Sequence, residues 1–186
     1  MTAKRSTSIL QRIRVPLGFA FGILFVLFAA PNWISLGTGI AVAFLGLLIR
    51  AWSTGHIRKN VEVSMSGPYS RTRNPLYLGS FIMGLGFSIA SGRWWLILAF
   101  AGFYLGIYLP VMRIEARELT SKFGDDYTRY AENVPLFFPR LAAYGEADAE
   151  FSKDLYLKYK EYQAAIGFVL VSLILVLKLY LLEYWR

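Results

Sequence analysis

The chain lacks cysteine altogether, and His56 is its only histidine among 186 residues. Without cysteine there can be no disulfide, no thiol nucleophile and no thiolate metal ligand. One histidine is too few for the metal sites that combine several imidazoles, so we expect no metal site. Charge is also missing over long distances, because no Asp, Glu, Lys, Arg or His occurs in residues 15–49, 74–92, 94–112 or 162–177.

The uncharged runs predict membrane helices. A bilayer core of about 30 Å is crossed by about 20 apolar residues in a helix, and a soluble helix would place polar residues on its outer face. The first run is long enough for two crossings, with Pro31-Asn32 as the break, and Gly92 marks a second turn. We therefore expect an all-α, polytopic membrane helix bundle that forms a single domain over residues 1–186. Its five expected spans are 15–31, 33–52, 75–91, 94–112 and 163–183.

Basic residues lie mostly on one side of these spans. Residues 1–14, 50–73 and 113–160 hold 17 of the 20 Lys and Arg residues. The positive-inside rule therefore places the N-terminus and the polar segments 53–74 and 113–162 in the cytoplasm, and we favour a bacterial inner membrane. Attraction to anionic lipid headgroups explains the formal net charge of +8, so we expect no nucleic-acid partner. The basic N-terminal stretch is interpreted as part of a retained first anchor rather than a cleaved signal peptide.

Two pairs of glycines recur at a spacing of four residues within the predicted spans. Gly18 and Gly22 form one pair, and Gly102 and Gly106 form the other. Such pairs would let two membrane helices approach closely, although the general tolerance of membrane helices for glycine explains each pair equally well.

The first polar segment combines a turn with the start of a helix. Gly67-Pro68 predicts the turn, and Pro75 suits the first turn of the third span, with Asn74 as its N-cap. The free backbone N–H groups of that helix start could bind an anionic group, with Arg73 beside them. Arginine and tyrosine at this place are equally well explained as membrane-interface anchors.

The second polar segment follows the fourth span directly. It opens with the helical residue Glu115, and Gly124 is expected to end that helix. Asp125 could then cap a short helix in which Tyr127 and Tyr130, three residues apart, share a face. The alternative interpretation is a solvated amphipathic helix followed by an interfacial loop.

Together, the two segments resemble the isoprenylcysteine carboxyl methyltransferases and the related membrane phospholipid methyltransferases. The pattern of that family runs Gly-Pro-Tyr, then Arg-His-Pro-x-Tyr-x-Gly, and after one helical hairpin a Glu-Glu pair, Phe-Gly-x-x-Tyr-x-x-Tyr and Val-Pro-x-x-x-Pro. This sequence departs from the pattern twice, with Asn74 in place of His and Ala116 in place of the second Glu. The matching positions, within residues 46–139, are Gly67-Pro68-Tyr69, Arg73, Pro75, Tyr77, Gly79, Glu115, Leu119, Phe123-Gly124, Tyr127, Tyr130, Val134-Pro135 and Pro139.

The resemblance implies a methyltransferase that takes its methyl group from S-adenosylmethionine (SAM), bound in a cytoplasm-facing pocket between the two segments. Four tyrosines would offer aromatic surface to the adenine or the sulfonium, Arg73 and Asn74 would hold the carboxylate, and Glu115 would hold the amino group or a ribose hydroxyl. The cofactor-binding residues implied in this way are Gly67, Pro68, Tyr69, Arg73, Asn74, Pro75, Tyr77, Gly79, Glu115, Tyr127 and Tyr130.

Two further residues are candidates for catalysis. Arg113 would orient an anionic acceptor, or could simply extend its charge to the interface. His56 is the side chain that could exchange protons near neutral pH. The acceptor should be amphiphilic, as a prenylated cysteine carboxylate, an isoprenoid acid or a phospholipid amine would be, and O-methylation is favoured. The alternatives are an NADPH-dependent membrane reductase of the sterol type and a non-enzymatic channel or scaffold.

Overall fold

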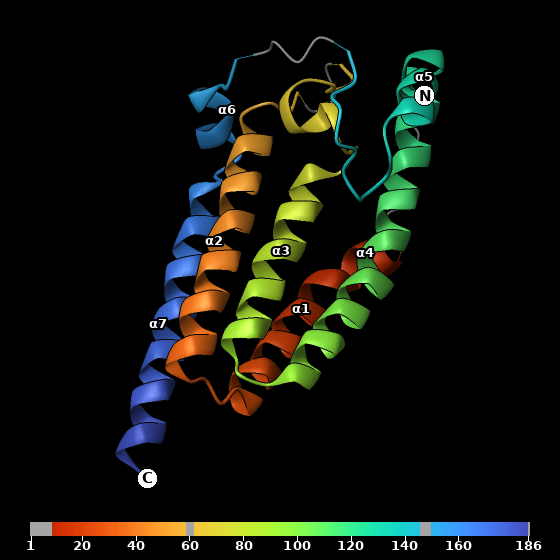
Figure 1. Ribbon diagram of the computed structural model, residues 1–186. Helices are drawn as coiled ribbons and strands as arrows, with labels where there is room; N and C mark the ends of the chain where they lie inside the picture. Colours follow the sequence, from red (N-terminus) through yellow and green to blue (C-terminus); the bar gives the residue numbers. More distant parts are fainter. Residues whose placement is uncertain (1–8, 59–61, 146–149, 186) are drawn as a thin grey trace.

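The computed structural model describes residues 9–58, 62–145 and 150–185, and this part of the chain is helical without strands. It forms α1 (Ile9–Phe28), α2 (Trp33–Thr54), a 3-10 helix η1 (Gly67–Ser70), α3 (Pro75–Ala90), α4 (Trp94–Phe123), α5 (Asp125–Asn133), α6 (Lys153–Lys158) and α7 (Tyr162–Tyr184). A helix covers most of each of the five ranges predicted as spans. The expected all-α bundle is confirmed (Figure 1).

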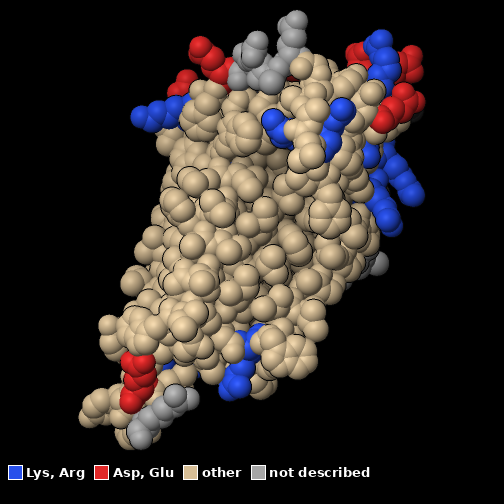
Figure 2. All heavy atoms as spheres, viewed as in Figure 1, with Lys and Arg blue, Asp and Glu red and all other residues tan. Residues whose placement is uncertain are grey.

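In the part of the chain that the structure describes, three helices are long and apolar enough to cross a membrane: α2, α4 and α7. The apolar part of α1, Pro16–Phe28, and the whole of α3 are shorter apolar helices. On the face seen in Figure 2, Lys, Arg, Asp and Glu gather at the two ends of the bundle and leave a broad uncharged belt between them. This distribution is that of an integral membrane protein, because charges in the bilayer core are costly.

The two predicted turns are present and pack against each other. Asn32 caps α2, since its side chain accepts from the backbone N–H of Ser35, whose hydroxyl in turn accepts from the backbone N–H of Asn32. The second turn contains Gly92 at φ +69°, where a Cβ would lie 2.4 Å from the carbonyl oxygen of Ala30. Both hairpins are therefore closed at the same end of the bundle, and η1 and α5 lie at the opposite end (Figure 1). We call that opposite end the η1 end.

Glycines allow α2 and α3 to pack backbone against backbone, but they are not the expected ones. A Cβ at Gly46 would lie 2.3 Å from the backbone nitrogen of Met83, and one at Gly86 would lie 2.2 Å from that of Ala43. Side chains at these positions would push the helices apart. Of the two explanations for the four-residue pairs, the structure agrees with general glycine tolerance and, among the described residues, shows no close approach of helices at these glycines. A Cβ at Gly18, Gly22, Gly102 or Gly106 meets nothing within 4 Å among the described atoms.

The helix α4 extends eleven residues beyond the predicted span end at Met112. The charged stretch from Arg113 to Lys122 continues the helix, and Gly124, at φ +56°, ends it as predicted. In Figure 1, α4 leans away from α3 toward the η1 end and carries α5 on its tip. The loop of residues 134–139 passes between α3 and α4 at this end, where Phe137 packs against Phe81 (Figure 1).

Candidate functional site

The two polar segments, far apart in the sequence, lie against each other at the η1 end. The backbone N–H of Arg73 donates to the carbonyl oxygen of Pro135 at 3.0 Å, and that of Tyr144 donates to the carbonyl oxygen of Ser70 at 3.0 Å. The Thr72 hydroxyl donates to the carbonyl oxygen of Phe137 at 2.8 Å. These contacts attach the loop after α5 to residues 70–73, which precede α3. Residues of both polar segments therefore lie together at the η1 end.

The side chain of Asn74 takes part in this attachment. Asn74 occupies the N-cap position of α3, as predicted, but its side chain makes no capping hydrogen bond. Instead, Asn74 Nδ2 donates to the carbonyl oxygen of Leu136 at 2.9 Å. An amide can make this bond without changing its protonation state. The first turn of α3 therefore begins with Pro75 and without a side-chain cap.

Tyr77 and Glu115 join α3 to α4 across the site. The Tyr77 hydroxyl donates to Glu115 Oε1 at 2.9 Å, and the hydroxyl of Tyr104 donates to the backbone carbonyl of Tyr77 at 2.8 Å. Tyr77 is thus held at both its backbone and its side chain. Gly79, half a turn further along α3, is buried against α2, where a Cβ would lie 2.7 Å from Cγ of Arg50. Its contribution in this structure is close helix packing.

The short helix α5 supplies two buried tyrosines. Tyr127 lies under Arg73, whose guanidinium carbon is 6.0 Å from the ring centroid, and Tyr130 donates from its hydroxyl to the backbone carbonyl of Tyr69 at 2.7 Å. Burial raises the pKa of Tyr127, against the opposing charge and hydrogen bond of Arg73. Burial also raises the pKa of Tyr130, and both rings stay neutral at ordinary pH. Asp125 is the first residue of α5 rather than its cap, because Gly124 occupies the cap position.

Two polar atoms in this region are buried without a hydrogen-bond partner among the described residues. They are the hydroxyl of Tyr69 and Nε of Arg73. Burial raises the pKa of the Tyr69 hydroxyl, and the nearby Tyr130 and Glu161 add to the rise, so it is a donor at neutral pH. Leaving a buried donor unsatisfied typically costs 1–3 kcal/mol. Two such donors on the predicted cofactor segment are what a polar ligand would satisfy.

The two candidate catalytic residues lie in different surroundings. His56 is buried: its Nδ1 is 2.9 Å from the carbonyl oxygen of Trp52, and its ring lies where a Cβ on Gly67 would come within 2.6 Å. Gly67 has φ +56°, so glycine is required there by both conformation and space. Pro68 follows it in η1 and is also buried. Arg113 is exposed on α4, two residues from Glu115 and hence on another face of the helix.

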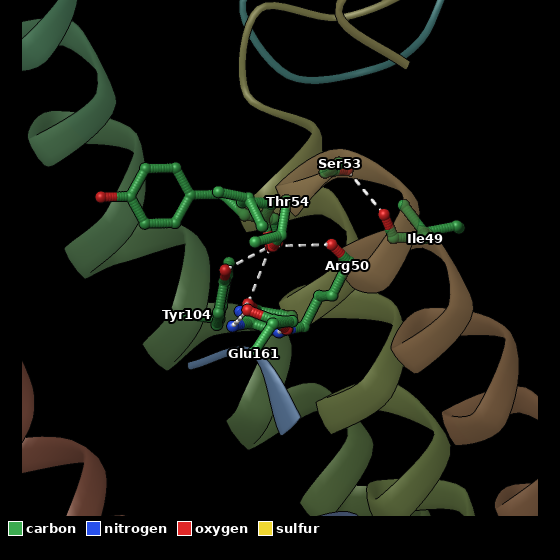
Figure 3. A network of polar contacts seen from close by, with 9 residues as sticks. Ile49, Arg50, Ser53, Thr54, Tyr104 and Glu161 are labelled. Atoms are coloured by element: carbon green, nitrogen blue, oxygen red, sulfur yellow. Dashed lines mark hydrogen bonds and ion pairs between the residues drawn. The ribbon is translucent and has the colours of Figure 1, made fainter. Parts of the chain in front are cut away.

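An ion pair that the sequence did not reveal lies beside the site. Arg50 Nε is 2.7 Å from Glu161 Oε1 and its Nη2 is 3.0 Å from Oε2, while its Nη1 donates to the hydroxyl of Ser80 (Figure 3). The pair joins α2 to the residue that precedes α7. Lys160, at φ +54°, makes the turn that directs Glu161 inward. The only signals in the sequence were that Arg50 closes the first uncharged run and Glu161 precedes the last.

A groove of about 650 Å³ approaches the site from within the apolar belt. It lies between one face of α1, including Gly18 and Gly22, and the residues Tyr108 of α4 and Val171 of α7. The ring of Tyr108 is 5.5 Å from that of Tyr77, centroid to centroid. Tyr108 therefore both lines the groove and contacts a residue of the polar site.

Comparison with known proteins agrees with the motifs. The family model described as phospholipid methyltransferase matches residues 19–126, which is more than half of the chain. This range includes α2, η1 and α3, and continues through α4 to the start of α5, but it excludes Tyr130 and α7. No solved structure matches the chain significantly.

Two curated bacterial proteins are similar over part of their length. The chain is 38% identical over 120 residues to the cobalt-zinc-cadmium resistance protein CzcN of Cupriavidus metallidurans, covering 62% of this chain and 53% of that protein. It is 37% identical over 121 residues to the nickel-cobalt-cadmium resistance protein NccN of Alcaligenes xylosoxydans xylosoxydans, covering 61% of this chain and 55% of that protein. The chain thus spans about half the length of the curated relatives it matches.

Proposed function

The chain belongs to the phospholipid methyltransferase family, and on that premise we propose that it transfers the methyl group of SAM to an amphiphilic acceptor at the membrane face. The observation that carries the proposal is the pair of buried, unpartnered donors on Tyr69 and Arg73, set in a motif segment that α4 and α5 complete. The family match also favours a methyltransferase over the NADPH-dependent reductase and the channel considered above.

The residues present fit SAM, because the site combines donors, a carboxylate and aromatic rings. Arg73 Nε would bind the cofactor's carboxylate, and Glu115, oriented by the Tyr77 hydroxyl, would bind its amino group or a ribose hydroxyl. The faces of Tyr77 and Tyr127 would lie against adenine or the sulfonium. Asn74 would act indirectly, since its side chain fixes the loop at Leu136.

The cofactor supplies an electrophilic methyl group on a positively charged sulfur, and the protein's part is to align donor and acceptor and to exclude water. Tyr130 fixes the backbone of Tyr69, and Tyr104, which lies outside the motif, fixes that of Tyr77, so both tyrosines of the first segment are held in place by α4 and α5. Tyr127 and Tyr130 stay neutral because burial raises their pKa values, so Tyr130 donates to the carbonyl of Tyr69 without adding charge.

The acceptor would come from the bilayer. The groove that Tyr108 lines lies in the apolar belt, so an apolar chain could occupy it while a headgroup lies near Tyr77. We favour a carboxylate acceptor, because its oxygen attacks without loss of a proton, whereas an ammonium group must first be deprotonated. His56, the residue suited to that proton transfer, is buried against Gly67. Arg113, exposed at the same end, would attract an anionic headgroup.

We place the η1 end in the cytoplasm, where SAM is found. The support is the excess of Lys and Arg at the ends of the spans on that side, under the positive-inside rule. A bacterial inner membrane is the setting that we favour. The expected single domain over residues 1–186 would then hold the cofactor on one side of the membrane and take its acceptor from the same leaflet.

The proposal is tested by calorimetry on the detergent-purified protein, titrated with SAM and, separately, with NADPH. We expect SAM to bind and NADPH not to bind. Glu115→Gln should weaken SAM binding about 10- to 100-fold, as expected for loss of a hydrogen bond to a charged group. The matched control is Glu132→Gln, which changes an exposed glutamate on α5. Binding of NADPH without SAM would refute the proposal, and equal effects of the two substitutions would refute the placement of the site.

A further inference from the structure

The loop that follows α5 presents apolar side chains outward at the η1 end. Phe138 is 68% exposed and Leu141 is 94% exposed, although the backbone N–H of Arg140 between them donates to the carbonyl oxygen of Arg71 at 2.9 Å. Pro139 lies between them and keeps this part of the loop from forming a helix. We call residues 137–141 the apolar loop. Large apolar side chains that are exposed next to each other mark contact surfaces.

The position of the apolar loop along the membrane helices indicates that lipid contacts it. The ring of Phe137 packs edge-on against Phe81, with ring centroids 5.7 Å apart. Phe81 lies in the second turn of α3, so the loop descends beside the first turns of an apolar helix instead of staying above it (Figure 1). Phe138 is the next residue, its ring centroid is 5.2 Å from that of Phe137, and its side chain is exposed. A side chain exposed beside the start of a membrane helix faces lipid.

Charge around the apolar loop agrees with a lipid leaflet as the partner. Residues 134–145 and 67–75, which pair with each other, contain three arginines and no Asp or Glu. Arg71 donates from its guanidinium to the carbonyl oxygen of Leu141, and Arg140 donates from Nη1 to that of Asn133 at 2.7 Å, so both cations are fixed at the loop. Apolar side chains beside fixed cations match the acyl chains and anionic headgroups of a phospholipid leaflet.

We propose that the apolar loop inserts Phe138 and Leu141 into the phospholipid leaflet at the η1 end. The inference goes beyond the methyltransferase proposal and does not depend on it. It has a consequence for the site, because the carbonyl groups of residues 135–137 accept the hydrogen bonds of Arg73, Asn74 and Thr72. The segment that contacts lipid is thus the same segment that positions the predicted cofactor-binding residues.

The absence of cysteine makes the test direct, since a single introduced cysteine can be spin-labelled without a background. The variants are Phe138→Cys and Leu141→Cys, both at exposed positions that tolerate a label. Leu98→Cys, on the lipid-facing side of α4, is the control for a label surrounded by lipid. Ser121→Cys, exposed near the end of α4, is the control for a label surrounded by water. Each protein is placed in vesicles of phosphatidylcholine and phosphatidylglycerol.

The measurement is the collision of each label with oxygen, which concentrates in lipid, and with a water-soluble nickel chelate. We expect positions 138 and 141 to follow position 98, with the ratio of oxygen to nickel accessibility at least threefold above that at position 121. A ratio at both positions equal to that at position 121 would overturn the proposal. Because no SAM is added, this outcome is independent of whether the protein binds SAM.

Discussion

Loss of the Glu161 carboxylate should destabilise the protein more than loss of any exposed acid. Glu161→Gln removes the bidentate partner of Arg50, and the two side chains are 7% and 23% exposed. Removing one partner of a buried ion pair costs about 3–5 kcal/mol, and we expect the lower end because Arg50 lies near the end of α2, where water can reach it. A loss of 3 kcal/mol is about a 160-fold change in the unfolding equilibrium.

The assay is thermal unfolding in detergent, followed by the fluorescence of the five tryptophans. By the behaviour of soluble domains of this size, 3 kcal/mol corresponds to a decrease in Tm of about 6–12 °C. The matched control is Glu62→Gln, which removes the Arg58–Glu62 pair, whose side chains are more than half exposed. Exposed pairs contribute at most about 1 kcal/mol, so this control should change Tm by no more than about 4 °C.

A double substitution separates the ion pair from the packing around it. Arg50→Met with Glu161→Leu replaces two charges by apolar groups, and the Ser80 hydroxyl still donates to the carbonyl oxygen of Leu76 at 2.8 Å. We expect the double variant to regain most of the stability lost by Glu161→Gln, because no unpaired charge is left. If Glu161→Gln and the exposed control shift Tm equally, the pair does not hold α2 to α7 and the reasoning is refuted.

Three further predictions concern stability. Gly46→Ala should cost about 1–3 kcal/mol because its Cβ would lie 2.3 Å from the backbone of α3, whereas Gly37→Ala, with open space around it, should be neutral or stabilising in chemical denaturation. Lys178→Met should lower the free energy of unfolding by about 1–2 kcal/mol, because Lys178 Nζ donates to carbonyl oxygens at the end of α1, including that of Leu27 at 2.8 Å. An unchanged melting curve would contradict this. Burial raises the pKa of Tyr130 above its ordinary value of 10, so the contribution of Tyr130 to stability is complete below pH 10 and is lost as the pH rises above 10. Tyr130→Phe should therefore reduce the loss of stability between about pH 9 and 11, and an identical pH dependence in the variant would count against this assignment.

Much of the fold could be predicted because charge-free runs leave few alternatives. The breaks at Pro31-Asn32 and at Gly92 were predicted, and both are turns in the structure. The end of α4 at Gly124 was predicted as well, but its continuity with the fourth span was not, since Arg113 begins a charged stretch and Met112 was taken as the end of the span. The helix continues because its charged residues are good helix formers. A helix can therefore extend past the point where it leaves the membrane.

The candidate site could be predicted in part. Tyr77 and Glu115 were identified from the motif, and in the structure their side chains form a hydrogen bond. The role of Asn74 was missed because its partner is a backbone carbonyl, which every residue has. Arg50 and Glu161 were missed for another reason: 111 residues separate them, and only the folded bundle brings the two charges together.

We propose that this membrane protein transfers the methyl group of SAM to an amphiphilic acceptor from the bilayer. This proposal is tested most directly by incubating the purified protein with SAM labelled in the methyl group and a membrane lipid extract, then extracting the lipid phase. We expect label in the lipid phase, released as methanol by alkali if the product is a methyl ester and retained if it is an amine. Glu115→Gln should abolish most of this transfer. If the lipid phase gains no label above that of a protein-free reaction while the protein is folded and bound to SAM, the account of the acceptor is contradicted.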